Sequence, residues 1–369
     1  MPKAASSDPY FGGPLTPGLR VCGARYLLRR LIGRGEFSEL WLARNIQNAG
    51  DVALKFLPKA FLQDKNLLDF LQEEVRRQTL LKHPHIVLVH ELAHDYDSTA
   101  IAMEFVDGWS LATLKVDKPE RRHNVSEIGP WIGQLCDALA FAHNEFGMVH
   151  GDLKPSNLLV SPRDGIKVSD FGLAAHIRNE SSKRGIVKSG YAGIGYLSPQ
   201  QVMGETPGKA DDIYSLGAAL FDLLTGTPPF YKGEVIAQIR SLKPPRMAQR
   251  LAELGVQGEP VPVVWEETVA VCLAKNPADR PQTAEEVRRL LDRPEPEAKD
   301  LIEPPKLPVA PGQSGGNPDA AAVTTTPRKA ARPWTPFVAA IVAAFVAVGL
   351  IGALWFIRSG KFAAILATG

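Results

Sequence analysis

Three side chains that could do chemistry together lie within six positions, in the segment "VHGDLKPSNLLV" at residues 149–160. They are Asp152, Lys154 and Asn157, and apolar residues typical of short strands flank them on both sides. Polar residues set this tightly between two strand-like pieces predict a short loop that faces a charged ligand. Gly151 stands directly before Asp152, where a bulky cation could have helped to hold the carboxylate.

A lysine earlier in the chain suits the same kind of ligand. Lys55 lies in "VALKFL", where strand alternation points its side chain to the same side as that of the small Ala53. A lysine that points into a cleft needs an anion, and the following helix offers Glu73 and Glu74. Glu74 is the better placed of the two, so we predict an ion pair between Lys55 and Glu74.

A second acidic group follows another strand-like piece. Asp170 lies in "VSDFGLA", directly after "IKV". Asp170 and Asn157 both offer hard oxygen ligands, which suit a Mg²⁺ ion that bridges phosphates.

A glycine-rich turn supplies a third feature, in "LIGRGEFSELWLA". Gly33 and Gly35 would let the backbone approach phosphate oxygens without interference from a Cβ atom. Ser38 replaces the third glycine of a GxGxxG spacing, and glycine turns are common in hairpins, so this signal is weak alone. No GxxxxGK[ST] segment follows, which argues against a P-loop nucleotide-binding protein.

The elements that must position these groups change in type along the chain. Short strands are predicted at 26–34, 38–44, 51–57, 86–93 and 99–105, with one amphipathic helix at 64–82. Helices dominate after that, beginning with residues 126–147, for which Ser126 is the predicted N-cap and Gly147 the predicted stop. A small β lobe on a larger α lobe would leave a cleft between them.

Bulk composition is that of a globular protein with a real core. The chain has 369 residues, 45% of them hydrophobic and 22% charged, with a net charge of +2. No dense basic run appears, so no nucleic-acid partner is predicted. Three cysteines lie far apart without a CxxC pair, which indicates reduced thiols. Residues 1–23 lack the apolar core of a secretory signal and are predicted to be a flexible lead-in.

Composition changes sharply at Pro294. Residues 294–333 hold nine prolines and few large apolar residues, which predicts a disordered linker with extended pieces. Residues 337–357, "FVAAIVAAFVAVGLIGALWFI", contain no charge, and as a helix they would be roughly 30 Å long, enough to cross a bilayer. We therefore predict a transmembrane helix at 334–358 and a short tail at 359–369. Basic residues are slightly more frequent before the span, which favours a cytoplasmic N-terminal side.

Taken together, the motifs resemble a known family. The segments "GRGEFSEL", "VALK", "HGDLKPSN", "DFG", "GYLSPQQ", "DIYSLG" and "NPADRPQTAEE" follow one another with the spacings of eukaryotic-type protein kinases. The chain most resembles the bacterial membrane-anchored Ser/Thr kinases. The resemblance implies an α+β, two-lobed protein kinase fold over residues 24–293, with a β-rich N-lobe at about 24–106 and a helical C-lobe at about 107–293. The linker and the membrane helix would follow this domain.

The resemblance also implies a role for each candidate residue, with ATP and Mg²⁺ as cofactors. Asp152 would be the catalytic base and Lys154 would steady the γ-phosphate, while Asn157 and Asp170 would hold Mg²⁺. The remaining positions would bind the nucleotide: Ile32, Gly33, Gly35, Ala53, Lys55, Glu74, Met103 as gatekeeper, Glu104, Val106 and Leu159. Asp212 and Arg280 match buried structural positions. The implied partners are protein substrates and ATP, a membrane reached through a single-pass helix, and a second copy of the chain in a homodimer.

Several positions depart from the family pattern. Gly151 replaces the arginine that reads a phosphorylated activation loop, so we expect activity to depend weakly on phosphates at Ser181, Ser182, Ser189 or Tyr191. Gln200 replaces a glutamate that pairs with the arginine at 280, and an amide can still accept from a guanidinium. Gly193 stands where Ser/Thr kinases place a threonine that braces the catalytic loop.

Two alternatives stay open at this point. Gly193 and Gln200 motivate a pseudokinase, which would bind ATP or act as a scaffold without phosphoryl transfer. A small-molecule kinase of the aminoglycoside or choline type would have a histidine where Lys154 stands, and it would lack the "SPQ" and "DIYSLG" segments.

Overall fold

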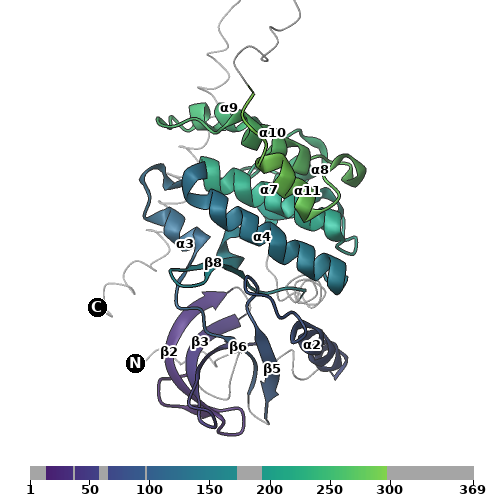
Figure 1. The fold of residues 1–369 in the computed structure, drawn as a ribbon. Helices are drawn as coiled ribbons and strands as arrows, with labels where there is room; N and C mark the ends of the chain where they lie inside the picture. Colours follow the sequence, from purple (N-terminus) through teal and green to yellow (C-terminus); the bar gives the residue numbers. More distant parts are fainter. Residues whose placement is uncertain (1–13, 36–37, 58–64, 96–97, 173–192, 297–369) are drawn as a thin grey trace, which may run out of the picture. The chain divides into compact units, whose positions relative to one another are not determined.

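A six-stranded antiparallel sheet forms the N-terminal part of the fold (Figure 1). The structure is a computed structural model, and it describes residues 14–35, 38–57, 65–95, 98–172 and 193–296. The strand order is β1-β2-β3-β4-β6-β5. The bounds are Arg20–Val21 for β1, Tyr26–Gly35 for β2, Ser38–Asn45 for β3, Asp51–Phe56 for β4, Val89–His94 for β5 and Thr99–Glu104 for β6.

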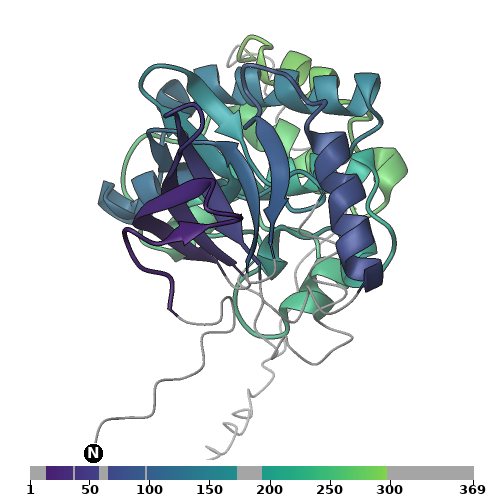
Figure 2. The same cartoon turned by 90° about the horizontal axis from the view of Figure 1, so that it is seen from below.

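The two faces of this sheet bury different residues, as strand alternation requires. Leu54 and Phe56 of β4 belong to one apolar cluster, whereas Ala53 belongs to a second cluster on the other face, together with Leu71 of α2. Helix α2 runs from Lys65 to Gln78 and lies alongside the sheet (Figure 2). The predicted placement of Lys55 on the side of Ala53 follows from this alternation.

Two predicted boundaries in the N-lobe were wrong. The helix expected to reach residue 82 ends at Gln78, where tighter turns replace the helical hydrogen bonds: Leu80 N donates to the Arg77 carbonyl at 3.1 Å and Leu81 N to the Gln78 carbonyl at 3.0 Å. The strand expected at 86–93 begins only at Val89. The preceding residues pair elsewhere: Ile86 forms a parallel bridge with Val168, and Val87 N donates to the Val168 carbonyl at 2.9 Å.

The C-lobe is helical and is centred on two long helices, α4 (Val125–Glu145) and α7 (Lys209–Thr225). The predicted apolar face of α4 is buried in the core, and almost every residue of α7 is buried as well. The other helices are α3 (Leu111–Val116), α6 (Pro199–Val202), α8 (Val235–Ser241), α9 (Met247–Glu253), α10 (Val263–Cys272) and α11 (Ala284–Leu291), and 3₁₀ turns lie at Pro119–Arg121, Pro155–Asn157, Ile194–Tyr196 and Pro277–Asp279.

The start of α4 corrects the predicted cap. Asn124, not Ser126, is the N-cap: its side chain accepts from Glu127 N at 2.9 Å, and the Glu127 carboxylate accepts from Asn124 N at 3.4 Å. This reciprocal capping box satisfies two backbone donors, which Ser126 could not do because it is already the second residue of the helix. The predicted stop at Gly147 is confirmed, because the helix ends at Glu145 and Gly147 is left-handed.

A small sheet of β7 (Trp109–Ser110), β8 (Leu158–Ser161) and β9 (Gly165–Val168) lies where the two lobes meet. Leu158 pairs with Val168, so the residue before β8 and the residue after β9 lie at the same end of the hairpin. Ser169 N accordingly donates to the Asn157 carbonyl at 3.0 Å. This hairpin brings the 149–157 loop next to the segment that holds Asp170.

The three cysteines are free and buried, in agreement with the prediction of reduced thiols. Among the described residues, no helix has the length and apolar character needed to cross a membrane. The predicted span at 334–358, the tail and nearly all of the predicted linker lie outside the described residues, as do residues 1–13 of the predicted lead-in. The prediction of a flexible lead-in was wrong for residues 14–23: Arg20–Val21 forms β1, and Leu15, Val21 and Cys22 are buried in an apolar cluster of the sheet.

Candidate active site

The 149–157 loop is attached to the core through one buried carboxylate. Asp212, in the first turn of α7, is completely buried and accepts from His150 N at 2.7 Å and from Gly151 N at 2.8 Å. The Nε2 atom of the buried His143 lies 2.8 Å from the same carboxylate. Asp212 therefore orients the backbone that leads directly into Asp152, and its predicted buried, architectural position is confirmed.

Gly151 has a conformational role that the sequence did not reveal. Its φ angle is +74°, in the left-handed region that costs an L-residue roughly 1–2 kcal/mol. Its carbonyl accepts from the side-chain amide of Gln201 at 2.8 Å. Gln201 was missed by sequence reasoning, and only its place next to the "SPQ" segment could have drawn attention to it. Both backbone polar groups of Gly151 are thus held by other elements.

The three polar side chains of the loop come together as predicted. Asp152 is 5% exposed, and Lys154 Nζ lies 2.7 Å from its Oδ2 atom. The Asn157 amide donates to the Asp152 carbonyl at 2.9 Å. The loop thus presents a carboxylate, an ammonium group and an amide oxygen within a few ångströms of one another.

The second acidic residue meets Lys55 at the same place. Lys55 Nζ lies 2.6 Å from Asp170 Oδ1. Burial by itself would raise the pKa of Asp170, but the charge of Lys55 and its hydrogen bond outweigh burial and hold that pKa below its usual range. Asp170 also has a left-handed φ of +66°, a strained conformation for a residue with a Cβ atom. The contact with Lys55 therefore keeps the Asp170 carboxylate ionised and fixes its orientation.

The predicted Lys55–Glu74 ion pair is not formed in this structure. Glu74 lies on α2 with its carboxylate 3.5 Å from Arg77, and burial raises the pKa of this carboxyl. Its Oε1 atom packs so closely on Gly172 that a Cβ atom added to Gly172 would lie 2.2 Å away. Lys55 instead contacts Asp170.

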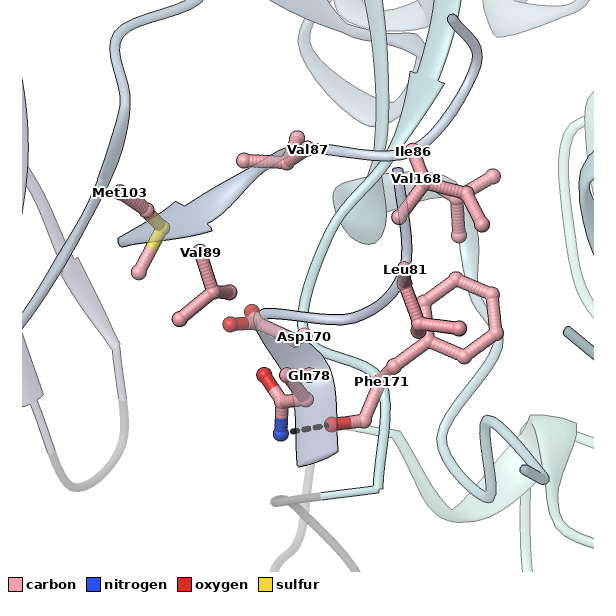
Figure 3. Close-up of a pocket in the computed structure, with 9 residues that line it drawn as sticks. All are labelled: Gln78, Leu81, Ile86, Val87, Val89, Met103, Val168, Asp170 and Phe171. Atoms are coloured by element: carbon pink, nitrogen blue, oxygen red, sulfur yellow. Dashed lines mark hydrogen bonds between the residues drawn. The ribbon is translucent and has the colours of Figure 1, made fainter. Parts of the chain in front are cut away.

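Four of the predicted adenine-binding residues lie in or against one apolar cluster. Ala53 and Met103 belong to a single apolar cluster, and Val106 and Leu159 pack against it. Ile32, from β2, is 36% exposed. Met103 also lines a small pocket (Figure 3), whose lining residues are Gln78, Leu81, Ile86, Val87, Val89, Met103, Val168, Asp170 and Phe171.

The glycine turn sits at the end of the β2–β3 hairpin. Gly33 pairs with Leu40, and Gly35 pairs with Ser38. A Cβ atom at Gly33 would meet no other atom within 4 Å, whereas at Gly35 it would lie 2.8 Å from the Ser38 hydroxyl. The residues at the very tip, 36–37, lie outside the described residues.

The segment after residue 192 contains two of the positions that depart from the family pattern, Gln200 and Gly193. Arg280 is 2% exposed, and its Nη2 atom donates to Gln200 Oε1 at 2.7 Å, so the amide does replace the expected carboxylate. Gly193 precedes the 3₁₀ turn of residues 194–196 and has no side chain that could brace the loop. Gln201, through its contact with Gly151, provides a link between this segment and the catalytic loop.

The donor set fits a hard divalent cation. Asp170 supplies an ionised carboxylate and Asn157 an amide oxygen, and the β8–β9 hairpin holds the two residues close together. A two-lobed fold with a loop that presents a carboxylate, a lysine and an amide, together with an apolar cluster that contains Ala53 and Met103, is typical of the protein kinase class.

Comparisons with known proteins agree with this assignment. The profile of the protein kinase domain matches residues 26–291, and the chain belongs to this family. The Ser/Thr-protein kinase PknB of Mycobacterium leprae is 34% identical over an alignment of 286 residues, and the match covers 73% of this chain and 43% of the relative. The Ser/Thr-protein kinase PrkC of Bacillus subtilis is 32% identical over an alignment of 274 residues, and the match covers 73% of this chain and 40% of the relative. The chain thus spans less than half of the length of these relatives.

A solved structure shows the same fold. The crystal structure of the kinase domain of PknI from Mycobacterium tuberculosis is 25% identical in sequence and superposes with a TM-score of 0.58. The match covers 76% of this chain and 99% of that domain. The two-lobed kinase fold and the resemblance to bacterial Ser/Thr kinases are therefore confirmed.

The left-handed backbone of Gly151 leads to a prediction about stability. Gly151→Ala should lower the free energy of unfolding by about 1–2 kcal/mol, because alanine must adopt the same positive φ. Chemical denaturation followed by fluorescence would measure the change. Gly133→Ala, inside α4, is the matched control and should be neutral or slightly stabilising, because its Cβ would have ordinary contacts. Equal stability of Gly151→Ala and wild type would contradict the prediction.

Proposed function

We propose that this chain is a Ser/Thr protein kinase that transfers the γ-phosphate of ATP to hydroxyl groups of protein substrates. The observation that carries the proposal is the meeting of Asp152, Lys154 and Asn157 with the Lys55–Asp170 pair at the junction of the lobes. The names of the related PknB and PrkC, both Ser/Thr-protein kinases, support the same activity. Lys154, two residues after the base, is typical of Ser/Thr kinases.

In the proposed mechanism, Asp152 accepts the proton of the substrate hydroxyl. Lys154, 2.7 Å from that carboxylate, offsets the negative charge that develops on the transferred phosphoryl group. Lys55 holds the α- and β-phosphates in place. Asn157 and Asp170 would hold Mg²⁺, and this ion, when bound, neutralises phosphate charge and aligns the γ-phosphate.

The nucleotide would bind against the apolar cluster at the back of the cleft. We assign the adenine edge to backbone groups of Glu104 and Val106, with Ile32, Ala53 and Leu159 on its faces. Met103, the assigned gatekeeper, lines the pocket of Figure 3. Gly33 and Gly35 would cover the phosphates, and Glu74 would position Lys55 if α2 moved towards it.

An assay with labelled ATP tests the central proposal. Autophosphorylation, and phosphorylation of a general protein substrate, should occur with wild type and fall by roughly 10²–10⁴-fold in Asp152→Asn, because the general base is lost. Asp117→Asn, at the exposed end of α3, should retain full activity. A wild-type chain that binds ATP but transfers no label would instead establish the pseudokinase alternative, which Gly193 motivates.

Regulation by the activation loop should be weak, since Gly151 replaces the cation that would bind a loop phosphate. Replacing Ser181, Ser182 and Ser189 together by alanine should leave the initial rate within about threefold of wild type. These serines lie outside the described residues. A large fall in rate, measured on protein treated with phosphatase and on untreated protein, would refute weak dependence.

For location, we propose that residues 334–358 anchor the chain in the cell membrane, with the kinase domain on the cytoplasmic side. The support is the charge-free run at 337–357. Full-length protein should sediment with membranes and resist extraction by salt or carbonate, while a chain ending at residue 296 should stay in the supernatant. Release of the full chain by high salt alone would show peripheral attachment.

A further inference from the structure

Lys167 in β9 is a buried lysine to which no role has yet been assigned. Its Nζ atom lies 2.9 Å from Glu104 Oε1 and 3.1 Å from Oε2. The two side chains are only 10% and 30% exposed. Because a lysine is costly to bury without a partner, this pair is the reason that Lys167 can occupy such a position.

Glu104 stands at the point where the N-lobe sheet ends. It is the last residue of β6, and two hydrogen bonds connect it to Leu88. Glu104 N donates to the Leu88 carbonyl at 2.8 Å, and Leu88 N donates to Glu104 Oε2 at 3.1 Å. The carboxylate therefore joins three segments: the end of β6, the chain before β5, and β9 through Lys167.

On the other side, Lys167 is the direct cross-strand partner of Leu159. Opposite residues of an antiparallel pair face the same side of the sheet, so the stem of Lys167 runs beside Leu159. Leu159 packs against the cluster that contains Ala53 and Met103. The ion pair is thus placed next to the apolar wall to which the adenine ring is assigned.

The same strand also leads to the metal-binding candidate. Asp170 follows Lys167 by three residues and contacts Lys55 on β4, the neighbour of β6 in the sheet. Two ion pairs, Lys167–Glu104 and Lys55–Asp170, therefore tie one short segment of the C-lobe to two adjacent strands of the N-lobe. Between them, Val168 pairs with Ile86.

We propose that Lys167 is a positioning residue for nucleotide binding. Its ion pair ties β9 to the end of β6 and so holds the Glu104 backbone and Leu159 at the separation that an adenine ring needs. The inference rests on the proposed function, because it assigns adenine to this cluster. Lys167 itself touches neither phosphate nor the transferred group.

Nucleotide affinity tests the inference without requiring phosphoryl transfer. Isothermal titration with Mg-ADP should show a Kd roughly five- to twentyfold higher for Lys167→Met than for wild type, the effect of losing a coupled buried pair. Adenosine should show a loss of similar size, because the effect concerns the ring and not the phosphates. Lys167→Arg keeps a cation and should stay within about threefold of wild type.

A matched control separates this role from general stability. Lys118→Met removes another Lys–Glu pair, with Nζ 2.7 Å from Glu127 Oε1, at the start of α4. It should leave the Kd for Mg-ADP unchanged. In the kinase assay, Lys167→Met should raise KM for ATP while kcat at saturating ATP stays within about threefold of wild type, because the catalytic loop is untouched.

The binding measurements distinguish a failure of the proposed kinase function from a failure of the positioning role of Lys167. A wild-type chain that fails to bind Mg-ADP would overturn the proposed function, and this inference with it. Wild-type binding combined with an equal Kd for Lys167→Met would overturn the inference alone. If Lys167→Met does not fold, Glu104→Gln replaces it: its amide oxygen can still accept from Leu88 N, and an unchanged Kd there would likewise overturn the inference.

Discussion

The hydrogen bonds that the buried Asp212 carboxylate accepts from the backbone of His150 and Gly151 are the constraint on which the site depends. A carboxylate with no exposed surface must be fully satisfied, and charge-assisted hydrogen bonds to backbone N–H groups are strong. Asp212 belongs to α7, whose residues are almost all buried, so the loop is attached to the most deeply packed helix of the C-lobe. The direction of Asp152 follows from that attachment.

This constraint also explains the residue at position 151. The backbone there is left-handed, and glycine adopts that conformation without the cost that a Cβ atom would add. Glycine at position 151 is therefore suited to its backbone conformation. Asp170, across the site, has a similar left-handed φ without being glycine, and its contact with Lys55 helps to offset the strain. Left-handed backbone thus occurs at Asp170 and directly before Asp152.

The partner of Lys55 was predicted wrongly from the sequence. The sequence offered Glu73 and Glu74 as partners of Lys55, and Asp170 was expected only as a metal ligand, yet Lys55 pairs with Asp170. The choice depends on how far α2 lies from β4, and Glu74 packs on Gly172 instead. Gln201 escaped notice for a similar reason, since an amide at the start of a short helix has no local pattern that would direct it to residue 151.

By itself, the sequence determined the class of fold, the strands β2 to β4 and the buried face of α4. It also showed that the side chains of Asp152, Lys154 and Asn157 lie close together. These features depend on local spacing and on motifs in fixed order. Tertiary structure alone decided that Lys55 meets Asp170, that Gln201 holds Gly151 and that Lys167 joins Glu104. These contacts connect residues 50 to 115 positions apart. Such distances follow from the packing of whole elements, and no periodicity along the chain encodes them.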